Sequence, residues 1–440
     1  MAQETRFLSA SSDLSRKRRA AEKRYRLYGL VAISIGLLML VILLTTIITK
    51  GVTAFQQTYI TLDIELLESK LDKKGNRDIN DIKKVSTFGY APLTKNSFEK
   101  LISANNLNTD LSPKNASKIL SKSAASELRN FVINDTSVIG RTISFEFLTN
   151  SWIDGYLKGR INRGDIQNSK NVSPEQLDLV DELVKLGIVE KKFNLSFLLG
   201  SDASDMRPEA AGFGVSMVGS FYMMLVVLLL SLPVGVAASI YLEEFAPRNW
   251  ITDIIEVNIS NLAAVPSIVF GILGLAVFIN FMHLPQSAPF VGGMVLTLMT
   301  LPTIIISTRA SLKSVPPSIR DAALGVGASK MQTVFHHVLP LAAPGILTGT
   351  IIGLAQALGE TAPLLLIGMI GYIATNMPST VLEGLASPNS AMPAQIYEWA
   401  KRSDPAFYER AWGGIIILLV FLITMNTLAV ILRRRFERRW

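Results

Sequence analysis

Residues 309–370 read RASLKSVPPSIRDAALGVGASKMQTVFHHVLP followed by LAAPGILTGTIIGLAQALGETAPLLLIGMI. The first part of this stretch is polar, basic and rich in Ala and Gly. The second part is apolar, exceeds the roughly 20 residues that a membrane-spanning helix needs, and contains a single ionisable residue, Glu360. A soluble loop therefore leads directly into a membrane segment, which indicates a membrane protein.

The composition agrees with this interpretation. Hydrophobic residues make up 49% of the 440 residues, and the mean hydropathy is +0.35. The apolar residues gather in six runs that are each long enough to cross a bilayer, at 27–49, 213–242, 259–282, 288–308, 344–370 and 411–432. We expect an all-α polytopic membrane protein with six transmembrane helices.

Basic residues give the chain a net charge of +8, and they lie beside the apolar runs instead of alternating with aromatic residues on a polar surface. This distribution argues against nucleic acid as a partner and follows the rule that cytoplasmic loops of membrane proteins are basic. Alternation of six spans then places both termini and the loop 309–343 in the cytoplasm. We expect a multi-pass protein of the bacterial cell inner membrane.

The start of the chain supports the same orientation. Residues 1–26 form a basic cytoplasmic N-terminus, and residues 27–49 form the first span. A secretory signal peptide has a shorter apolar core followed by a small-residue cleavage site. The apolar run is too long for that pattern, so we expect an uncleaved transmembrane helix.

Residues 50–208 separate the first two spans and are too many for a structureless loop. The alternating residues 59–66 predict a strand, whereas 173–187 predict a helix that begins at an N-cap, Ser173, and ends at Gly187. A second helix is expected over 112–133. We expect a soluble extracytoplasmic α+β domain with a structural or partner-contacting role, and a sensory role is the alternative.

The cytoplasmic loop predicts a helical hairpin. Ser318 is a candidate N-cap, and Asp321 three residues later completes a capping box. Ala322 and Ala323 leave little side-chain bulk on this first helix, so a groove in another protein could close around it. Gly327 can adopt the left-handed conformation that ends a helix.

The second helix of the hairpin is expected over 330–339, with Pro340 as its stop. The alternative to a docking hairpin is a solvated amphipathic loop that has no partner.

The pattern D-A-A-x-x-x-G that begins at Asp321, with L-P at 339–340, resembles the EAA loop of ABC-importer permeases. Asp321 replaces the usual Glu, and His337 stands where an apolar residue is common. G-E-T-A-P-L-L at 359–365, A-V-P-S-I-V-F-G-I-L-G-L-A-V-F and S-L-P-V-G-V-A-A-S-I-Y-L-E-E-F resemble the PstA-type permeases of bacterial phosphate importers. The resemblance implies an ABC type I importer permease domain over 209–440, with 309–343 as its coupling loop.

This resemblance also implies partners. The chain would be a permease subunit of an ATP-driven importer of inorganic phosphate, paired with a PstC-like permease and surrounded by membrane lipid. A PstB-like ATPase dimer and an extracytoplasmic phosphate-binding protein would complete the importer.

The sequence contains no G-x-x-x-x-G-K-[ST] phosphate loop. We therefore expect a non-catalytic subunit that binds no cofactor, with ATP used by the partner ATPase. The chain also has no Cys, which excludes a thiolate metal site, and we expect no metal site.

Four residues are candidates for the translocation path or its gate: Glu360, Thr361, Gln356 and Arg309. Ionisable residues within a membrane usually face a bundle interior or a wet pathway. The charge of Glu360 has the wrong sign to bind phosphate, so we expect an ion pair with an arginine, which the partner permease could supply. Thr361 and Gln356 can donate hydrogen bonds to an anion.

Two of these assignments have alternatives. Glu360 could be protonated and bonded to a neighbouring helix, and Arg309 could anchor a helix at the membrane boundary. Related permeases often carry basic residues near the positions of Ile306 and Gln356, which are neutral in this chain. The resemblance therefore implies that the partner permease supplies much of the positive lining.

Competing functions are a permease for another oxyanion, a membrane-anchored sensor that uses the 50–208 domain, and an intramembrane enzyme with Glu360 as its acid or base. An intramembrane enzyme would need a second carboxylate or a metal cluster at the same membrane depth as Glu360, and the sequence offers neither.

Overall fold

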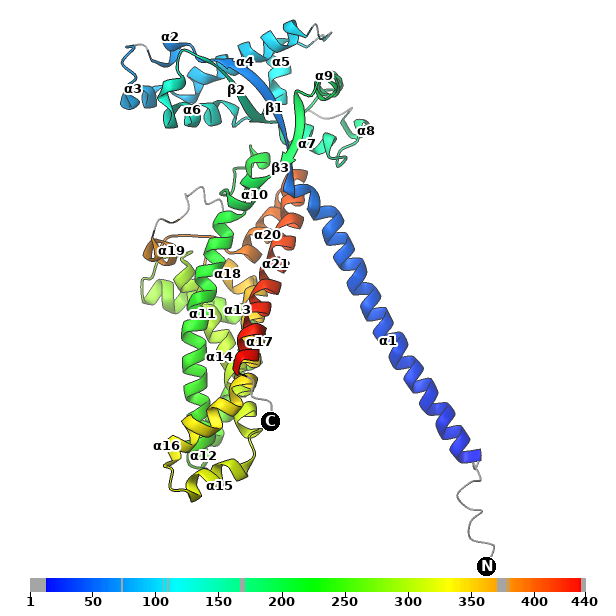
Figure 1. Cartoon of the computed structure of the whole chain (residues 1–440), viewed down its shortest axis with the longest axis vertical. Helices are drawn as coiled ribbons and strands as arrows, with labels where there is room; N and C mark the ends of the chain where they lie inside the picture. Colours follow the sequence, from blue (N-terminus) through cyan, green and yellow to red (C-terminus); the bar gives the residue numbers. More distant parts are fainter. Residues whose placement is uncertain are drawn as a thin grey trace, which may run out of the picture. The chain divides into compact units, whose positions relative to one another are not determined.

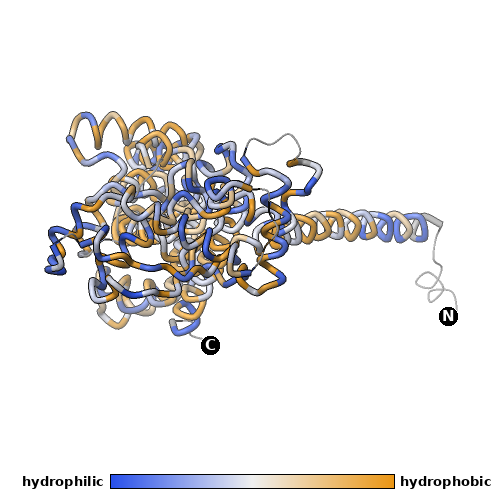
Figure 2. The backbone as a smooth tube through the Cα atoms, turned by 90° about the horizontal axis from the view of Figure 1, so that it is seen from above, coloured by the Kyte–Doolittle hydropathy of each residue, from blue (hydrophilic) through white to orange (hydrophobic). Residues whose placement is uncertain are grey.

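The computed structural model describes residues 13–72, 74–105, 107, 109, 111–166, 171–369, 378 and 380–436. The chain forms two compact units that divide between Lys50 and Gly51. The first unit is helix α1 (Asp13–Gly51), which contains the expected first span. Figure 2 shows that hydrophobic residues occupy much of this helix. Their side chains are exposed, as expected for a surface that faces lipid.

The second unit begins with a small three-stranded antiparallel sheet in the order β2–β1–β3 (Figure 1). The strands are β1 (Gln56–Glu65), β2 (Thr142–Leu148) and β3 (Val189–Phe193). Alternate residues of β1, including Ile60, Leu62 and Ile64, are fully buried. The strand predicted over 59–66 is therefore confirmed.

Helices surround this sheet. The longer ones are α4 (Thr87–Ala104), α6 (Ala124–Asn134) and α9 (Pro174–Lys185). Shorter turns are η1 (Val52–Phe55), α2 (Glu68–Leu71), α3 (Ile79–Lys84), α5 (Pro113–Ala116), η2 (Ser117–Ile119), η3 (Thr136–Val138), α7 (Ser151–Leu157), α8 (Arg163–Ile166), α10 (Leu195–Leu199) and η4 (Pro208–Ala210).

Helix α9 confirms the helix predicted over 173–187, and Gly187 follows it with a positive φ of 70°. The single helix predicted over 112–133 is wrong. The chain leaves the helical conformation at Leu120, which forms a bridge to Thr149, and Ser121 N–H donates to the Leu148 carbonyl at 2.8 Å. Pairing with the end of β2 therefore interrupts the helix, a long-range contact that local propensity does not contain.

The remaining helices form the membrane part. The long ones are α11 (Gly214–Ile240) with its π-helical turn η5 (Tyr241–Phe245), α14 (Pro289–Lys313), α17 (Leu339–Gly359) and α21 (Pro405–Phe436). The others are α12 (Trp250–Ala263), α13 (Ser267–Leu273), η6 (Gly274–Phe281), α15 (Pro317–Gly325), α16 (Lys330–Thr333), η7 (Val334–Val338), α18 (Ala362–Leu366), α19 (Val381–Ala386) and α20 (Met392–Lys401).

Helices α11 and α14 pack closely because glycines face side chains of the partner helix. A Cβ on Gly235 would lie 2.7 Å from Ile304, and one on Gly293 would lie 2.5 Å from Val226. Small residues allow such close approach in membranes, where dispersion rather than the hydrophobic effect holds helices together.

Two predicted spans differ from the structure. Among the described residues five helices are long and apolar enough to cross a membrane. The run 259–282 covers the end of α12 together with α13 and η6, and these two helical segments are bent by 103° relative to each other. The bend lies at Pro266, the N-cap of α13, which has no N–H to continue α12.

The run 344–370 is also not one helix, since the helical segment 330–359 ends at Gly359 and Glu360 has an extended ψ of 125°. Pro363 explains the break, because in a continuous helix its ring would clash with the carbonyl of Gly359. Residue 370 lies outside the described residues.

Candidate functional site

The loop between α14 and α17 contains two short helices, α15 and α16 (Figure 1). Helix α15 does not begin as predicted, because Pro316 is its N-cap and Ser318 makes no capping hydrogen bond. Pro317, with its fixed φ, starts the helix two residues earlier than predicted. Asp321 is exposed, so the predicted capping box of Ser318 and Asp321 is wrong.

A capping box does occur at the second helix. The Oγ of Ser329 accepts from Gln332 N–H at 3.2 Å, and the Gln332 side chain accepts from Ser329 N–H at 2.9 Å. Helix α16 then continues through the π-helical turn η7 into α17. The predicted stop at Pro340 is wrong, since Pro340 lies in the first turn of α17 after η7. The wider π turn accommodates the missing N–H of the proline.

The end of α15 is as predicted. Gly327 has a φ of 88°, Ala328 N–H donates to the Ala323 carbonyl, and Gly327 N–H donates to the Leu324 carbonyl. These two bonds define a Schellman motif, in which a glycine avoids the strain that a side chain would meet at positive φ.

The two small residues of α15 lie on different surfaces. Ala323 is buried, whereas Ala322 is exposed. Val326 beside them is 85% exposed, and Leu324 and Met331 are also exposed. The outer surface of the loop is therefore small, apolar and uncovered within the described chain.

The inner side of the loop is held by charge. Arg320 lies 2.6 and 3.1 Å from Glu244 Oε1 through Nη2 and Nε, and it donates to the carbonyls of Val315 and Leu312 at 2.8 and 2.9 Å. Both charged side chains are largely buried. This multiply bonded pair fixes α15 to the turn η5 at the end of α11.

Arg309 makes a second set of ion pairs, at 2.6 Å to Glu256 on α12 and 3.4 Å to Glu243 on η5. Lys313 lies 3.5 Å from Glu243. An apolar cluster joins the same elements, made of Ile240, Leu312, Val315, Val334, Val338, Ala342 and Ile346. The loop, α11, α14 and the start of α17 are thus bonded together.

An open apolar groove of about 620 Å³ adjoins this cluster. Residues of α11 and η5, among them Pro233 and Phe245, form one wall, and residues of α16 to α17, among them Met331 and Phe335, form the other.

The path candidates lie at the opposite end of α17. Gln356 is exposed on the helix, and Glu360 and Thr361 form the break after it, each half-buried. Glu360 N–H donates to the Ala357 carbonyl at 3.3 Å. Within the described residues the Glu360 carboxylate makes no ion pair, so the arginine expected beside it is not supplied by this part of the chain. Arg309 lies on α14, in the ion pairs described above.

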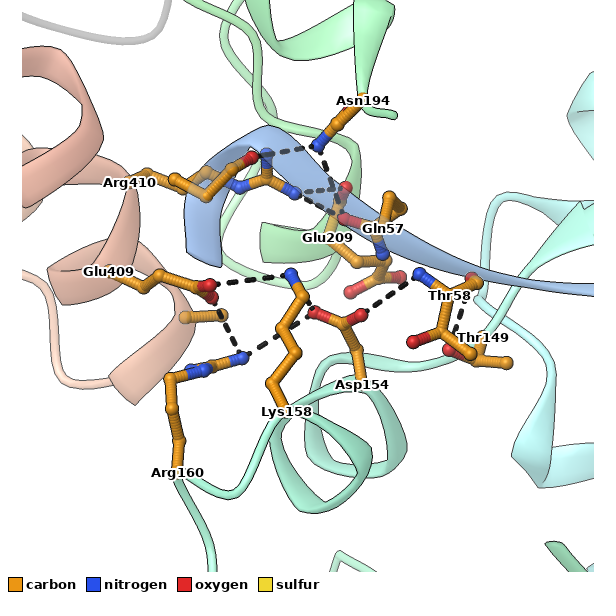
Figure 3. Close-up of polar contacts among 12 residues, drawn as sticks. Gln57, Thr58, Thr149, Asp154, Lys158, Arg160, Asn194, Glu209, Glu409 and Arg410 are labelled. Atoms are coloured by element: carbon orange, nitrogen blue, oxygen red, sulfur yellow. Dashed lines mark hydrogen bonds and ion pairs between the residues drawn. The ribbon is translucent and has the colours of Figure 1, made fainter. Parts of the chain in front are cut away.

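Sequence reasoning missed the carboxylates that hold the loop, Glu243, Glu244 and Glu256. A signal was present, because two adjacent acidic residues close an apolar run on the side where the basic loop is expected. It also missed a polar cluster where the 50–208 insert meets the first turn of α21 (Figure 3).

In that cluster Lys158 Nζ lies 2.7 Å from Asp154 and 3.3 Å from Glu409, and Arg160 lies 2.9 Å from Glu409. The side chains of Lys158 and Glu409 are only 1% and 2% exposed. Burial lowers the pKa of Lys158, and the two carboxylates oppose that shift.

Next to Glu409, Arg410 donates to the Gln57 side chain at 2.6 Å and to the Glu209 carbonyl at 2.9 Å (Figure 3). The insert and α21 therefore share a buried ionic interface.

Comparisons with known proteins agree with this geometry. Residues 231–440 match the family described as "Binding-protein-dependent transport system inner membrane component", and residues 13–166 match a "Domain of unknown function (DUF3333)". The chain is 31% identical over 250 residues to a "Probable ABC transporter permease protein YqgI" of Bacillus subtilis, covering 55% of this chain and 84% of the relative.

It is also 29% identical over 224 residues to "Phosphate transport system permease protein PstA" of Yersinia pestis, covering 50% of this chain and 73% of the relative. Among solved structures, a chain of the MetNI methionine ABC transporter is 15% identical with a TM-score of 0.38, covering 52% of this chain and 95% of that one. The resemblance carried by the loop and by G-E-T-A-P-L-L is confirmed, and the chain belongs to the binding-protein-dependent permeases of ABC importers, as a member of PstA type.

Proposed function

We propose that this chain forms half of the translocation path of an ATP-driven importer of inorganic phosphate. A PstC-like permease would form the other half, a PstB-like ATPase dimer would bind the loop 309–343, and an extracytoplasmic phosphate-binding protein would deliver the substrate. The observation that carries this proposal is the loop itself. Its outer surface around Ala322 and Val326 is exposed, whereas its inner side is bonded to the turn η5, through the ion pair of Arg320 with Glu244.

In the proposed topology the loop and both termini are cytoplasmic and the insert is extracytoplasmic. The bent pair α12 and α13 with η6 would count as the sixth span. The domains would then be a basic N-terminus (1–26), a first span (27–49), the insert (50–208) and the permease domain (209–440). ATP would be hydrolysed by the partner, and this chain would bind no cofactor or metal.

The proposed mechanism follows from these bonds. When the ATPase subunits close, they displace α15. Because Arg320 and the apolar cluster join α15 to α11 and α17, these helices move together. Helix α17 has 21 residues, so its far end lies about 30 Å away. The displacement would change the surroundings of Gln356, Glu360 and Thr361, which we assign to the path or gate.

The surface for the partner permease would include α12. None of its residues is buried, although Asn258 and Asn261 are polar. The Asn258 amide donates to the Ile254 carbonyl of the same helix at 2.8 Å, but its oxygen still requires protein or water as a partner, because lipid cannot satisfy polar groups.

The test is uptake of labelled phosphate in cells that lack this chain and are complemented with variants. Gly327→Asp should abolish uptake without preventing membrane insertion, because a side chain at a φ of 88° strains the turn after α15. Gly325→Ala is the matched control, since a Cβ there meets no atom within 4 Å and should leave uptake unchanged. Uptake that persists in the Gly327 variant, or that never depended on the chain, would contradict the proposal.

A second candidate is a permease for another oxyanion. It is favoured by the neutral residues Ile306 and Gln356, where related phosphate permeases often carry basic ones. Sulfate and molybdate in the same uptake assay separate the two candidates.

A further inference from the structure

A cavity of about 580 Å³ lies where the insert meets Asp404, the residue before α21. Four lysines line it from the insert, on α4, α5, η2 and the turn before α6: Lys95, Lys114, Lys118 and Lys122. Three carboxylates also line it, one from the end of the insert, one from η4 and one from the residue before α21: Asp205, Glu209 and Asp404. The charge of these seven side chains is therefore 4 − 3 = +1 when all are ionised.

The carboxylates already have donors. Asp205 lies 3.4 Å from the Arg402 guanidinium, and Glu209 accepts from the Ser121 hydroxyl. Asp404 accepts from the Ser151 hydroxyl at 3.2 Å and from Ala406 N–H at 2.9 Å. Glu209 and Asp404 are thus bonded to neighbouring groups of the protein, whereas the Asp205 side chain is 80% exposed.

The lysines differ in this respect. Within the described residues none of the four lysines forms an ion pair. Lys122 Nζ lies 4.0 Å from Met206 Sδ. Ser117 and Asn150 in the same lining already donate, to the carbonyls of Lys114 at 3.0 Å and Lys118 at 2.7 Å. The cavity therefore offers the positive charge of four lysines that no carboxylate of the described chain pairs.

We propose that this cavity binds an oxyanion of the phosphate type. A tetrahedral oxyanion supplies several acceptor oxygens and negative charge, which are the complement of four ammonium groups that line one cavity. All four lysines are exposed, so the ligand exchanges with solvent and the site senses its concentration. The choice of phosphate over sulfate rests on the proposed function, whereas the oxyanion site rests on the lining alone.

The cavity lies beside the start of α21, so a bound ligand would also act on that helix. Asp404 lies immediately before α21, and Glu209 bonds through its carbonyl to Arg410 on that helix. A ligand in the cavity contacts both the insert and the residues that anchor the outer end of α21. It therefore stabilises the arrangement of insert and α21 that is seen here.

The experiment is lysine protection in the full chain in detergent, with inorganic phosphate, sulfate or chloride added before brief acetylation and mass spectrometry. Phosphate should slow acetylation of Lys114, Lys118 and Lys122, and leave Lys185 and Lys191 unchanged. These two controls are exposed lysines of the insert outside the cavity. Slowing by sulfate to the same extent supports an oxyanion site without phosphate selectivity. Equal rates at every lysine, or slowing by chloride alone, would overturn the proposal.

A binding measurement with labelled phosphate provides the second readout. Lys118→Gln with Lys122→Gln should weaken binding about tenfold, because each exposed ammonium contributes a few-fold to affinity. Lys191→Gln should not weaken it. An unchanged affinity in the double variant would contradict the assignment.

The Gly327→Asp chain separates this inference from the proposed function. The lysines of this variant should still be protected by phosphate, because the cavity is far from Gly327 in the sequence. If the lysines are protected and cells show no phosphate uptake through the wild-type protein, the site is supported and the transport proposal is refuted. Phosphate-dependent uptake without protection would do the reverse.

Discussion

Arg320 shows how one side chain can connect a soluble loop to a membrane helix. It satisfies two main-chain carbonyls of its own loop and pairs with Glu244 at the end of α11. A largely buried, multiply bonded pair has a defined geometry, so movement of α15 cannot occur without movement of η5.

We expect Arg320→Gln and Glu244→Gln each to lower the ratio of phosphate transported to ATP hydrolysed, and the exchanged pair Arg320→Glu with Glu244→Arg to recover part of it. The ratio is measured in proteoliposomes with the partner subunits. Arg248→Gln is the control, since Arg248 is exposed and forms no ion pair within the described chain. A normal ratio in both single variants would show that this pair transmits nothing.

Glu209 is a residue whose charge opposes folding. Burial raises the pKa of its carboxyl above the ordinary 4.5, and the hydrogen bond from Ser121 only partly offsets this. A raised folded-state pKa favours folding below 4.5, and this contribution is lost as the pH rises through the folded pKa.

Glu209→Gln should therefore stabilise the protein at neutral pH by about 1 kcal/mol, because the amide keeps an acceptor without the desolvated charge. The gain should disappear as the pH falls below 4.5, where the wild-type carboxyl is also neutral. Thermal unfolding of both chains across this range checks the sign. A gain that grows on acidification would be inconsistent with a raised pKa.

At the scale of elements, the first turn of α21 is joined to α7 by ionic contacts among Asp154, Lys158, Arg160 and Glu409. Breaking a buried pair by removing one partner leaves an uncompensated charge, which usually costs more than the intact pair contributes.

We expect Glu409→Gln to destabilise the protein by about 3 kcal/mol. Adding Lys158→Met should restore part of this loss, because the number of buried cations then falls with the number of carboxylates. Unfolding of the two single variants and the double variant forms the cycle. Additive losses would show that Lys158 and Glu409 do not interact.

The break between α17 and α18 is a second feature at this scale. Pro363 ends α17 before Glu360, and it packs against α13, where a Cβ on Gly271 would lie 2.7 Å from the Pro363 Cα. The break gives Glu360 an extended main-chain conformation and makes Thr361 the N-cap of α18.

Pro363→Ala should allow α17 to continue through Glu360 and should reduce phosphate uptake several-fold while membrane insertion is retained. Pro344→Ala, inside the regular part of α17, is the control that should leave uptake near wild type. Equal uptake in both variants would show that the break has no role in transport.

At the scale of the whole molecule, the orientation of the chain can be tested directly because it has no Cys. Phe88 in the insert is 86% exposed and Val326 in the loop is 85% exposed. A membrane-impermeant maleimide applied to spheroplasts should label Phe88→Cys, and should label Val326→Cys only after permeabilisation. The opposite pattern would place the loop outside and exclude its binding to a cytoplasmic ATPase.

Sequence by itself determined the features that depend on local composition. Apolar runs of sufficient length placed the long helices, alternation placed β1, and the conformational freedom of glycine placed the end of α15 at Gly327. The motifs at 321–340 and 359–365 were enough to indicate the permease family. Each of these signals is carried by residues close together in the chain, so no knowledge of packing was needed.

Only the tertiary structure decided which charges meet and where helices break. Glu244 and Arg320 are 76 residues apart, and Lys158 and Glu409 are 251 apart, so no local pattern links them. Leu120 left a helical sequence to pair with β2, and Pro340 continued a helix where Pro266 and Pro363 mark breaks. These outcomes depend on which neighbours can satisfy a freed hydrogen bond or a buried charge, and those neighbours come together only when the chain folds.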